Sequence, residues 1–252
     1  TLEVLDKAGI AHGGGGINLE EARRPAVVER KGVKVAFVCR TSVCTVEAPA
    51  TPKRAGLAVV KVATAYEAPS PLPKEVPGMA PIIHTIPNPA DVATLREDIA
   101  AAKLQADVVV VSWHWGVSPY SGGQGELVEY QTAMAHLAID AGADLVVGHH
   151  PHLVQPIEVY RGKVIFYSLA NFVHDGGSFW GKKQDTILAR CRIRGGKINE
   201  VSFVPGMINE QNQPVPLRPA AAPELLRHIQ TVSAVFGTGF DVKDEEVVIH
   251  TK

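Results

Sequence analysis

The order of apolar and polar positions along the 252-residue chain predicts a protein in which strands and helices alternate. Two runs, residues 107–111 and 144–147, are apolar after an initial aspartate, which is typical of strands buried on both faces of a sheet. Between them, residues 125–141 carry apolar side chains at helical spacing. A strand, a helix and a strand in this order form a crossover unit, so we expect the two strands to be parallel neighbours.

Shorter alternating segments flank this unit. Three of them have glycine at a turn and predict antiparallel hairpins, over residues 26–38, 157–167 and 187–204. Asn88 before Pro89 is a favourable helix start, and apolar residues recur at helical spacing up to Ala102. We expect a last helix over residues 223–235 and a short strand or tail over residues 241–252. The pattern therefore predicts a mixed α/β protein with a parallel centre and antiparallel additions.

One long segment shows no sustained period. Residues 42–90 hold nine of the 18 prolines in the chain. Because structureless loops of this length are usually functional, we interpret this segment as a cover over one end of the sheet. A surface insertion without a role is the alternative. We expect residues 1–204 to form one domain, and residues 205–252 to be a connection, a helix and a tail that pack on it.

Composition narrows the classes of function. The chain has 25 Lys and Arg against 26 Asp and Glu, a formal charge of −1, and no basic patch that favours nucleic acid. No apolar run is as long as a transmembrane segment, and nothing resembles a signal peptide. We interpret the three cysteines as reduced thiols of a soluble, cytoplasmic protein, although Cys39 and Cys44 could pair.

Histidines follow both apolar strands. Gly148-His149-His150-Pro151-His152 comes directly after the second strand, and His114 comes after the first. Imidazole is the commonest metal ligand and the side chain that titrates near neutral pH. Because adjacent parallel strands end at the same edge of a sheet, where ligands bind, we expect His114 to approach the cluster.

Pro151 can fix a turn in which His150 and His152 face one metal ion. Zinc, iron and manganese all accept imidazole, so the residues do not choose among them. The alternative is that these are loop histidines that bond backbone carbonyls.

Four further residues are candidates for substrate binding. The amide of Asn171 could ligate a metal, bind a substrate carbonyl, or satisfy loop backbone groups. His174 could join the site or pair with its neighbour Asp175. Trp115 and Trp180 could form the wall of a pocket, although aromatic side chains usually belong to the core. Motifs of nucleophilic serine enzymes, P-loops and paired C-x-x-C cysteines are absent from the sequence.

These motifs resemble those of the CapA family, the poly-γ-glutamate capsule biosynthesis proteins. The resemblance covers residues 1–204, and the family usually has Gly where this chain has Ala170. The most specific motifs are His114-Trp115-Gly116, Asp140-Ala141-Gly142-Ala143-Asp144, Gly148-His149-His150-Pro151-His152 and Tyr167-Ser168-Leu169-Ala170-Asn171-Phe172. The resemblance implies a metallophosphatase-like (calcineurin-like) fold, a mixed β-sandwich flanked by helices in the order α/β/β/α. Because the family's Gly-Asp, Asn-Leu-Glu and Asn-Asn-His motifs lie upstream, we expect this chain to lack the N-terminal part of that fold.

The resemblance implies a hydrolase that acts on an amide or phosphoester bond, in a small-molecule, peptide or polyglutamate substrate, through a metal-activated water. His114, His150 and His152 would then hold a divalent metal, which is zinc, manganese or iron. His149 is the alternative register and, with His114, would be catalytic through proton transfer, while Asn171 would orient the substrate. The family's aspartate and asparagine ligands have no counterpart in this sequence.

Two alternatives of a different class stay open. A non-catalytic component could bind an anionic polymer during capsule synthesis or export, through Arg23, Arg24, Lys182 and Lys183. A metal-independent enzyme could use the histidines as acid and base, for example to epimerise an amino acid. Family members concerned with capsule are typically held outside the membrane. The resemblance and the cysteine content therefore favour different locations.

Overall fold

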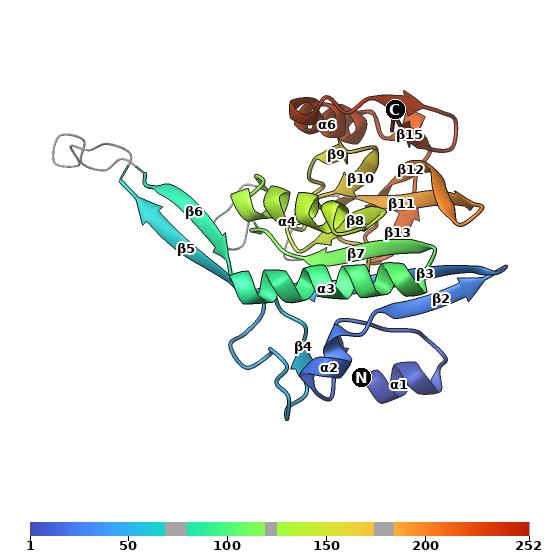
Figure 1. Ribbon diagram of the computed structural model, residues 1–252. Coiled ribbons are helices and arrows are strands. Elements are labelled where there is room, and N and C mark those ends of the chain that lie inside the picture. The colour runs from blue at the N-terminus through green and yellow to red at the C-terminus, as the bar shows by residue number, and fades with distance from the viewer. Residues whose placement is uncertain (69–79, 119–124, 174–183, 252) are drawn as a thin grey trace.

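The computed structural model describes residues 1–68, 80–118, 125–173 and 184–251 (Figure 1). Its main sheet has six strands in the order β2-β3-β7-β8-β10-β9. The strands are β2 (Ala26–Arg30), β3 (Val33–Thr41), β7 (Val108–His114), β8 (Leu145–His149), β9 (Ile157–Tyr160) and β10 (Lys163–Phe166). The four inner strands are parallel, and the edge strands β2 and β9 are antiparallel to their neighbours. The predicted parallel pair and the first two hairpins are confirmed.

A second sheet packs on one face of the first (Figure 1). It contains the third predicted hairpin and three short strands, namely β11 (Gln184–Arg194), β12 (Lys197–Ile208), β13 (Pro214–Pro216), β14 (Phe240–Val242) and β15 (Val247–Ile249). Val108 and Val110 of β7 face Phe203 of β12 in the core between the sheets. β12 runs through residue 204, so the C-terminal segment begins inside this sheet, and α6 (Pro223–Ser233) packs into the same core.

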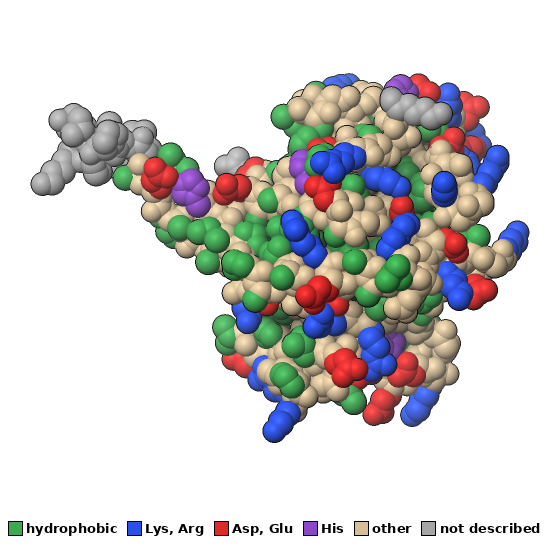
Figure 2. Space-filling model, viewed as in Figure 1, with side chains coloured by type: hydrophobic (Ala, Val, Ile, Leu, Met, Phe, Trp, Pro, Cys, Tyr) green, Lys and Arg blue, Asp and Glu red, His purple; other side chains and the backbone are tan. Residues whose placement is uncertain are grey.

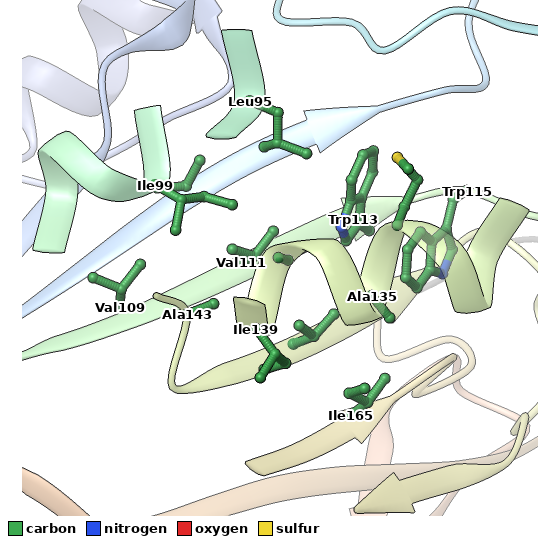
Figure 3. Close-up of a cluster of buried hydrophobic side chains, with 14 of the residues drawn as sticks. Leu95, Ile99, Val109, Val111, Trp113, Trp115, Ala135, Ile139, Ala143 and Ile165 are labelled. Atoms are coloured by element: carbon green, nitrogen blue, oxygen red, sulfur yellow. The ribbon is translucent and has the colours of Figure 1, made fainter. Parts of the chain in front are cut away.

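Two helices cover the other face of the main sheet (Figure 1). They are α3 (Pro89–Gln105) and α4 (Glu129–Asp140). The Asn88 side chain accepts hydrogen bonds from the first turn of α3, as the cap prediction requires. Because side chains alternate along a strand, Val109, Val111 and Trp113 face the helices (Figure 3), while Val108 and Val110 face the second sheet. α4 begins at Glu129 rather than at Gly125, whose backbone is left-handed.

The N-terminal segment forms small elements below the main sheet (Figure 1). They are α1 (Leu2–Lys7), β1 (Gly15–Gly16), α2 (Leu19–Arg23) and β4 (Gly56–Leu57). β1 pairs with β4, and α1 has no buried residue. Among the residues that the structure describes, no helix has the length and apolar character needed to cross a membrane.

The expectation that residues 42–90 lack regular structure is wrong. β5 (Val62–Glu67) and β6 (Ile82–Pro87) form an antiparallel hairpin that extends away from the two sheets (Figure 1). We call β5 and β6 the arm. The strands escaped detection because each spans six residues, and the intervening prolines masked their alternation.

Candidate functional site

Three neighbouring parallel strands end at one level of the main sheet. Thr41 of β3 is the register partner of His114 on β7, and His114 is the partner of His149 on β8. Parallel strands present their carboxyl ends at a common edge, which is where ligands bind in open α/β sheets. The sheet register therefore brings the two histidine motifs together.

The imidazole rings converge as the sequence predicts. His114 and His150 meet edge to face with ring centroids 4.7 Å apart, and the rings of His150 and His152 are 5.9 Å apart. The turn after β8 achieves this with a left-handed backbone at His150 (φ 99°) and His152 (φ 59°). Such strain in non-glycine residues concentrates at functional sites.

Glycine is the one residue type that fits at position 148, where this turn starts. A Cβ on Gly148 would lie 2.0 Å from the carbonyl oxygen of Tyr167 and 2.4 Å from the indole nitrogen of Trp115. In the space left open, Trp115 Nε1 donates a hydrogen bond of 2.8 Å to that carbonyl. This hydrogen bond links Trp115, which follows β7, to Tyr167, which follows β10, and so connects the segments that lie next to the histidines.

Oxygen atoms of the protein hold the Nδ1 atoms of three of these histidines. Thr41 Oγ1 lies 3.0 Å from His114 Nδ1, and because the same hydroxyl can donate its proton to the carbonyl of Val43 or of His114, it is able to accept from the ring. His149 Nδ1 lies 3.2 Å from the Trp113 carbonyl oxygen, and His152 Nδ1 lies 2.6 Å from Asn171 Oδ1. An acceptor at Nδ1 selects the tautomer in which Nε2 carries the lone pair, as in histidines that bind metals or accept protons.

The site favours neutral imidazoles. Burial lowers the pKa of His114 and His149, against backbone hydrogen bonds that raise it. The pKa of His150 is lowered to about 4, first by burial and then by the charges that His114 and His152 would carry. Because His114, His149 and His150 resist protonation at neutral pH, their nitrogen lone pairs stay available to bind a metal ion or to accept a proton during a reaction.

A hollow of about 500 Å³ adjoins His114 and His149. Its walls come from α1, from the glycine run at Gly13–Gly15 and from the ends of β3 and β7. The lining is mainly apolar, and the hollow is open to solvent.

The structure places the remaining predicted residues differently. Asn171 reaches the site through His152, as described above. Trp115 is fully buried and stacks on Trp113 at 5.0 Å, so it offers a substrate no surface (Figure 3). The pocket-wall expectation for Trp115 is therefore replaced by a role in the core. His174 and Trp180 lie outside the described residues.

The fit to a metal ion is incomplete. The donor chemistry suits one, because neutral imidazoles with the lone pair on Nε2 are metal ligands. The number of ligands does not, because within residues 1–68, 80–118, 125–173 and 184–251 no three His, Cys, Asp or Glu side chains are disposed to hold a metal ion. These side chains by themselves do not close a metal site.

Thr41 and the cluster of charged side chains next to it in the sequence and in space were not predicted from the sequence. Arg40, with a side chain only 3% exposed, pairs with Asp98 of α3, and Arg23 bonds the same carboxylate at 2.8 Å. This cluster anchors the end of β3 that carries Thr41. Thr41 lies beside His114 because β3 pairs in parallel with β7, and the local pattern of residues 33–38 does not reveal that pairing.

Comparison with known proteins agrees with the motifs. The sequence matches the family described as "Bacterial capsule synthesis protein PGA_cap" over residues 1–176. It is 41% identical over 130 residues to the PGA biosynthesis protein CapA of Bacillus subtilis (strain 168), covering 52% of this chain and 32% of that protein. It is 30% identical over 253 residues to the capsule biosynthesis protein CapA of Bacillus anthracis, covering 99% of this chain and 53% of that protein.

This chain thus spans between about a third and about half of the length of these relatives. A crystal structure of a hypothetical protein from Thermus thermophilus aligns over 73% of this chain and 61% of its own, with 13% identity and a TM-score of 0.40. The family match covers well over half of the sequence and includes both histidine motifs. The chain belongs to the bacterial capsule synthesis protein family PGA_cap.

Proposed function

We propose that this chain carries the histidine side of a hydrolytic site that acts on the amide bonds of poly-γ-glutamate. The substrate class is taken from the names of the relatives, which concern the biosynthesis of PGA and capsule. The observation that carries the chemistry is the meeting of His114 and His150 at 4.7 Å beside His149, at the carboxyl edge of the parallel strands. The proposal includes a metallophosphatase-like arrangement, which the stacking of two sheets under a helical layer supports.

His149 is the proton-transfer group in this proposal. Its Nδ1 donates to the Trp113 carbonyl oxygen, so Nε2 can take a proton from water as the water attacks the amide carbon. The C–N bond then breaks, and the same nitrogen returns the proton to the leaving amine. The products are a carboxyl group and a free amine.

Asn171 has a positioning role in the proposal. Its Oδ1 accepts from Nδ1 of His152 and so fixes the ring of that histidine. Thr41 does the same for His114. Both interactions set the direction of Nε2 before any substrate arrives.

We include a divalent metal, zinc, manganese or iron, only as an additional partner, to which at most two of His114, His150 and His152 would contribute ligands at once. No step above depends on it, because the described side chains do not complete a metal site. When bound, such an ion would polarise a water or a carbonyl oxygen.

The test measures free amines released from poly-γ-glutamate, together with the metal content of the same protein by elemental analysis. His149→Gln should lower the rate by about 100-fold or more. His150→Ala and His152→Ala should lower both the rate and the metal content. His250→Gln is the matched control, because His250 is half exposed and pairs with Asp241 in the second sheet.

Undiminished hydrolysis in His149→Gln and His150→Ala would refute the hydrolytic site. Full activity in metal-free protein would remove the metal and leave the histidines as acid and base. Polymer binding without hydrolysis that survives replacement of His150 and His152 would favour the binding component instead.

A further inference from the structure

The arm exposes apolar side chains and an open strand edge. Tyr66 is 70% exposed, and Ile83 and Ile86 are both more than half exposed. Figure 2 shows hydrophobic side chains along the arm, which Figure 1 shows extending from the body. In the described part of the chain β5 pairs with β6 alone. A two-stranded hairpin with this much apolar surface is marginally stable in water, so we expect another strand or protein surface to cover the arm.

The backbone of β5 shows which of its groups face outward. Lys61 N donates to Asp91 Oδ2, and Lys61 O accepts from Asn88 N, so the polar groups of Lys61 face β6 and α3. Backbone polar groups alternate in direction along a strand. Those of Val62, Thr64 and Tyr66 therefore face away from β6, and Pro87, which has no N–H, is the register partner of Val62.

The charges at the two ends of β5 complement each other about its middle. Lys61 and Glu67 are both exposed and lie at equal distances in sequence from Thr64. One carboxylate oxygen of Glu67 also pairs with His84 of β6 at 2.7 Å. An antiparallel pairing of two β5 strands centred on Thr64 places Lys61 of each copy opposite Glu67 of the other. The same register places Val62 opposite Tyr66, on the other face.

We propose that β5 pairs with β5 of a second copy of this chain, around a two-fold axis at Thr64. In this register Val62, Thr64 and Tyr66 of each copy, the residues whose polar groups face outward, form the hydrogen-bonded pairs. The result is a four-stranded sheet in the order β6-β5-β5-β6. Two oppositely charged pairs and two pairs of Val62 with Tyr66 flank the axis, as an isologous interface requires.

The self-complementary charges select a second copy over an unrelated strand. A strand that pairs antiparallel with β5 in this register must have an acidic residue opposite Lys61 and a basic residue opposite Glu67. β5 itself meets that condition. The apolar pairing alone would accept many partners.

The test is sedimentation of the full chain over a range of concentrations. The wild-type chain should show a monomer–dimer equilibrium. Lys61→Glu or Glu67→Lys alone should weaken dimerisation by about tenfold or more, because two attractive pairs become repulsive. The double variant Lys61→Glu/Glu67→Lys should restore it, and a mixture of the two single variants should form a heterodimer.

Lys53→Glu and Glu47→Lys are the matched controls, because both residues are exposed outside the arm and carry the same change in charge. Thr64→Pro should give a monomer with a folded hairpin, because its nitrogen faces away from β6. A wild-type chain that is monomeric at every concentration would overturn the proposal. A dimer that is indifferent to Thr64→Pro and to the charge reversals would overturn it too.

Discussion

His114 ends β7 and His150 lies in the turn after β8, yet their rings meet edge to face with centroids 4.7 Å apart. The turn that brings the two rings together has a left-handed backbone at His150, whose φ is 99°. Such a conformation in a non-glycine residue costs about 1 to 3 kcal/mol. On either side of this residue and its neighbour, Gly148 lies against the Tyr167 carbonyl and Pro151 is buried.

The strain at His150 predicts a difference between two substitutions. His150→Gly and His150→Ala both remove the imidazole, but only glycine adopts a φ of 99° without strain. We expect the glycine variant to be more stable to denaturant than the alanine variant by about 1 kcal/mol. Both should lose hydrolysis equally. An alanine variant as stable as the glycine variant would show that the turn is not strained.

Ala170 predicts a stabilising substitution. Its φ is 63°, which lies in the left-handed region that disfavours a Cβ. Ala170→Gly should raise the free energy of unfolding by about 1 kcal/mol. Ala101→Gly, at an exposed position inside α3, is the control and should lower it by about 1 kcal/mol. Chemical denaturation measures both, and a loss of stability in the first variant would contradict the left-handed assignment.

Gly148→Ala should be strongly destabilising. The new Cβ would lie 2.0 Å from the Tyr167 carbonyl oxygen, so the hydrogen bond from Trp115 Nε1 must break or β8 must move. We expect a loss of about 3 kcal/mol, with a change in tryptophan fluorescence. Gly15→Ala is the control, because a Cβ there meets only ordinary contacts at 3.8 Å or more. Equal stability of the two variants would argue against the close approach.

The environment of Asp144 predicts that the free energy of unfolding falls at acid pH. Burial opposes its ionisation, but hydrogen bonds from Lys103, Lys163 and the backbone N–H of Val109 outweigh burial and lower its pKa below the ordinary 3.8. A lowered pKa in the folded state means that this group's contribution is fully present above the ordinary value. The contribution is lost as the pH falls through the folded pKa.

Replacement of Asp144 tests that sign. The difference in unfolding free energy between the wild-type chain and Asp144→Asn should be constant near neutral pH and should shrink as the pH falls below 3.8. Asp140→Asn, which removes a partly exposed pair with Arg161, is the control and should cost at most about 1 kcal/mol. A difference that grows in acid would contradict the lowered pKa.

The candidate site was predicted in outline because its histidines follow two strands with unmistakable apolar runs. Parallel strands end together, so the meeting of His114 with the later cluster follows from periodicity alone. Thr41 was not predictable in this way, since its place beside His114 depends on the pairing of β3 with β7. Trp115 was misjudged because a strand end does not show which side chains the helical layer covers.

The sequence by itself determined the central strand-helix-strand unit, the three antiparallel hairpins over residues 26–38, 157–167 and 187–204, and the position of His114 and of the later histidine cluster directly after two strands. These are local properties, set by periodicities of two and 3.6 residues and by glycine at turns. Only the tertiary structure decided that Gly148 lies against the Tyr167 carbonyl, that His150 turns back with positive φ, and that β5 and β6 leave the body as an arm. Those features arise from contacts between segments far apart in the chain, and the local sequence pattern does not encode such contacts.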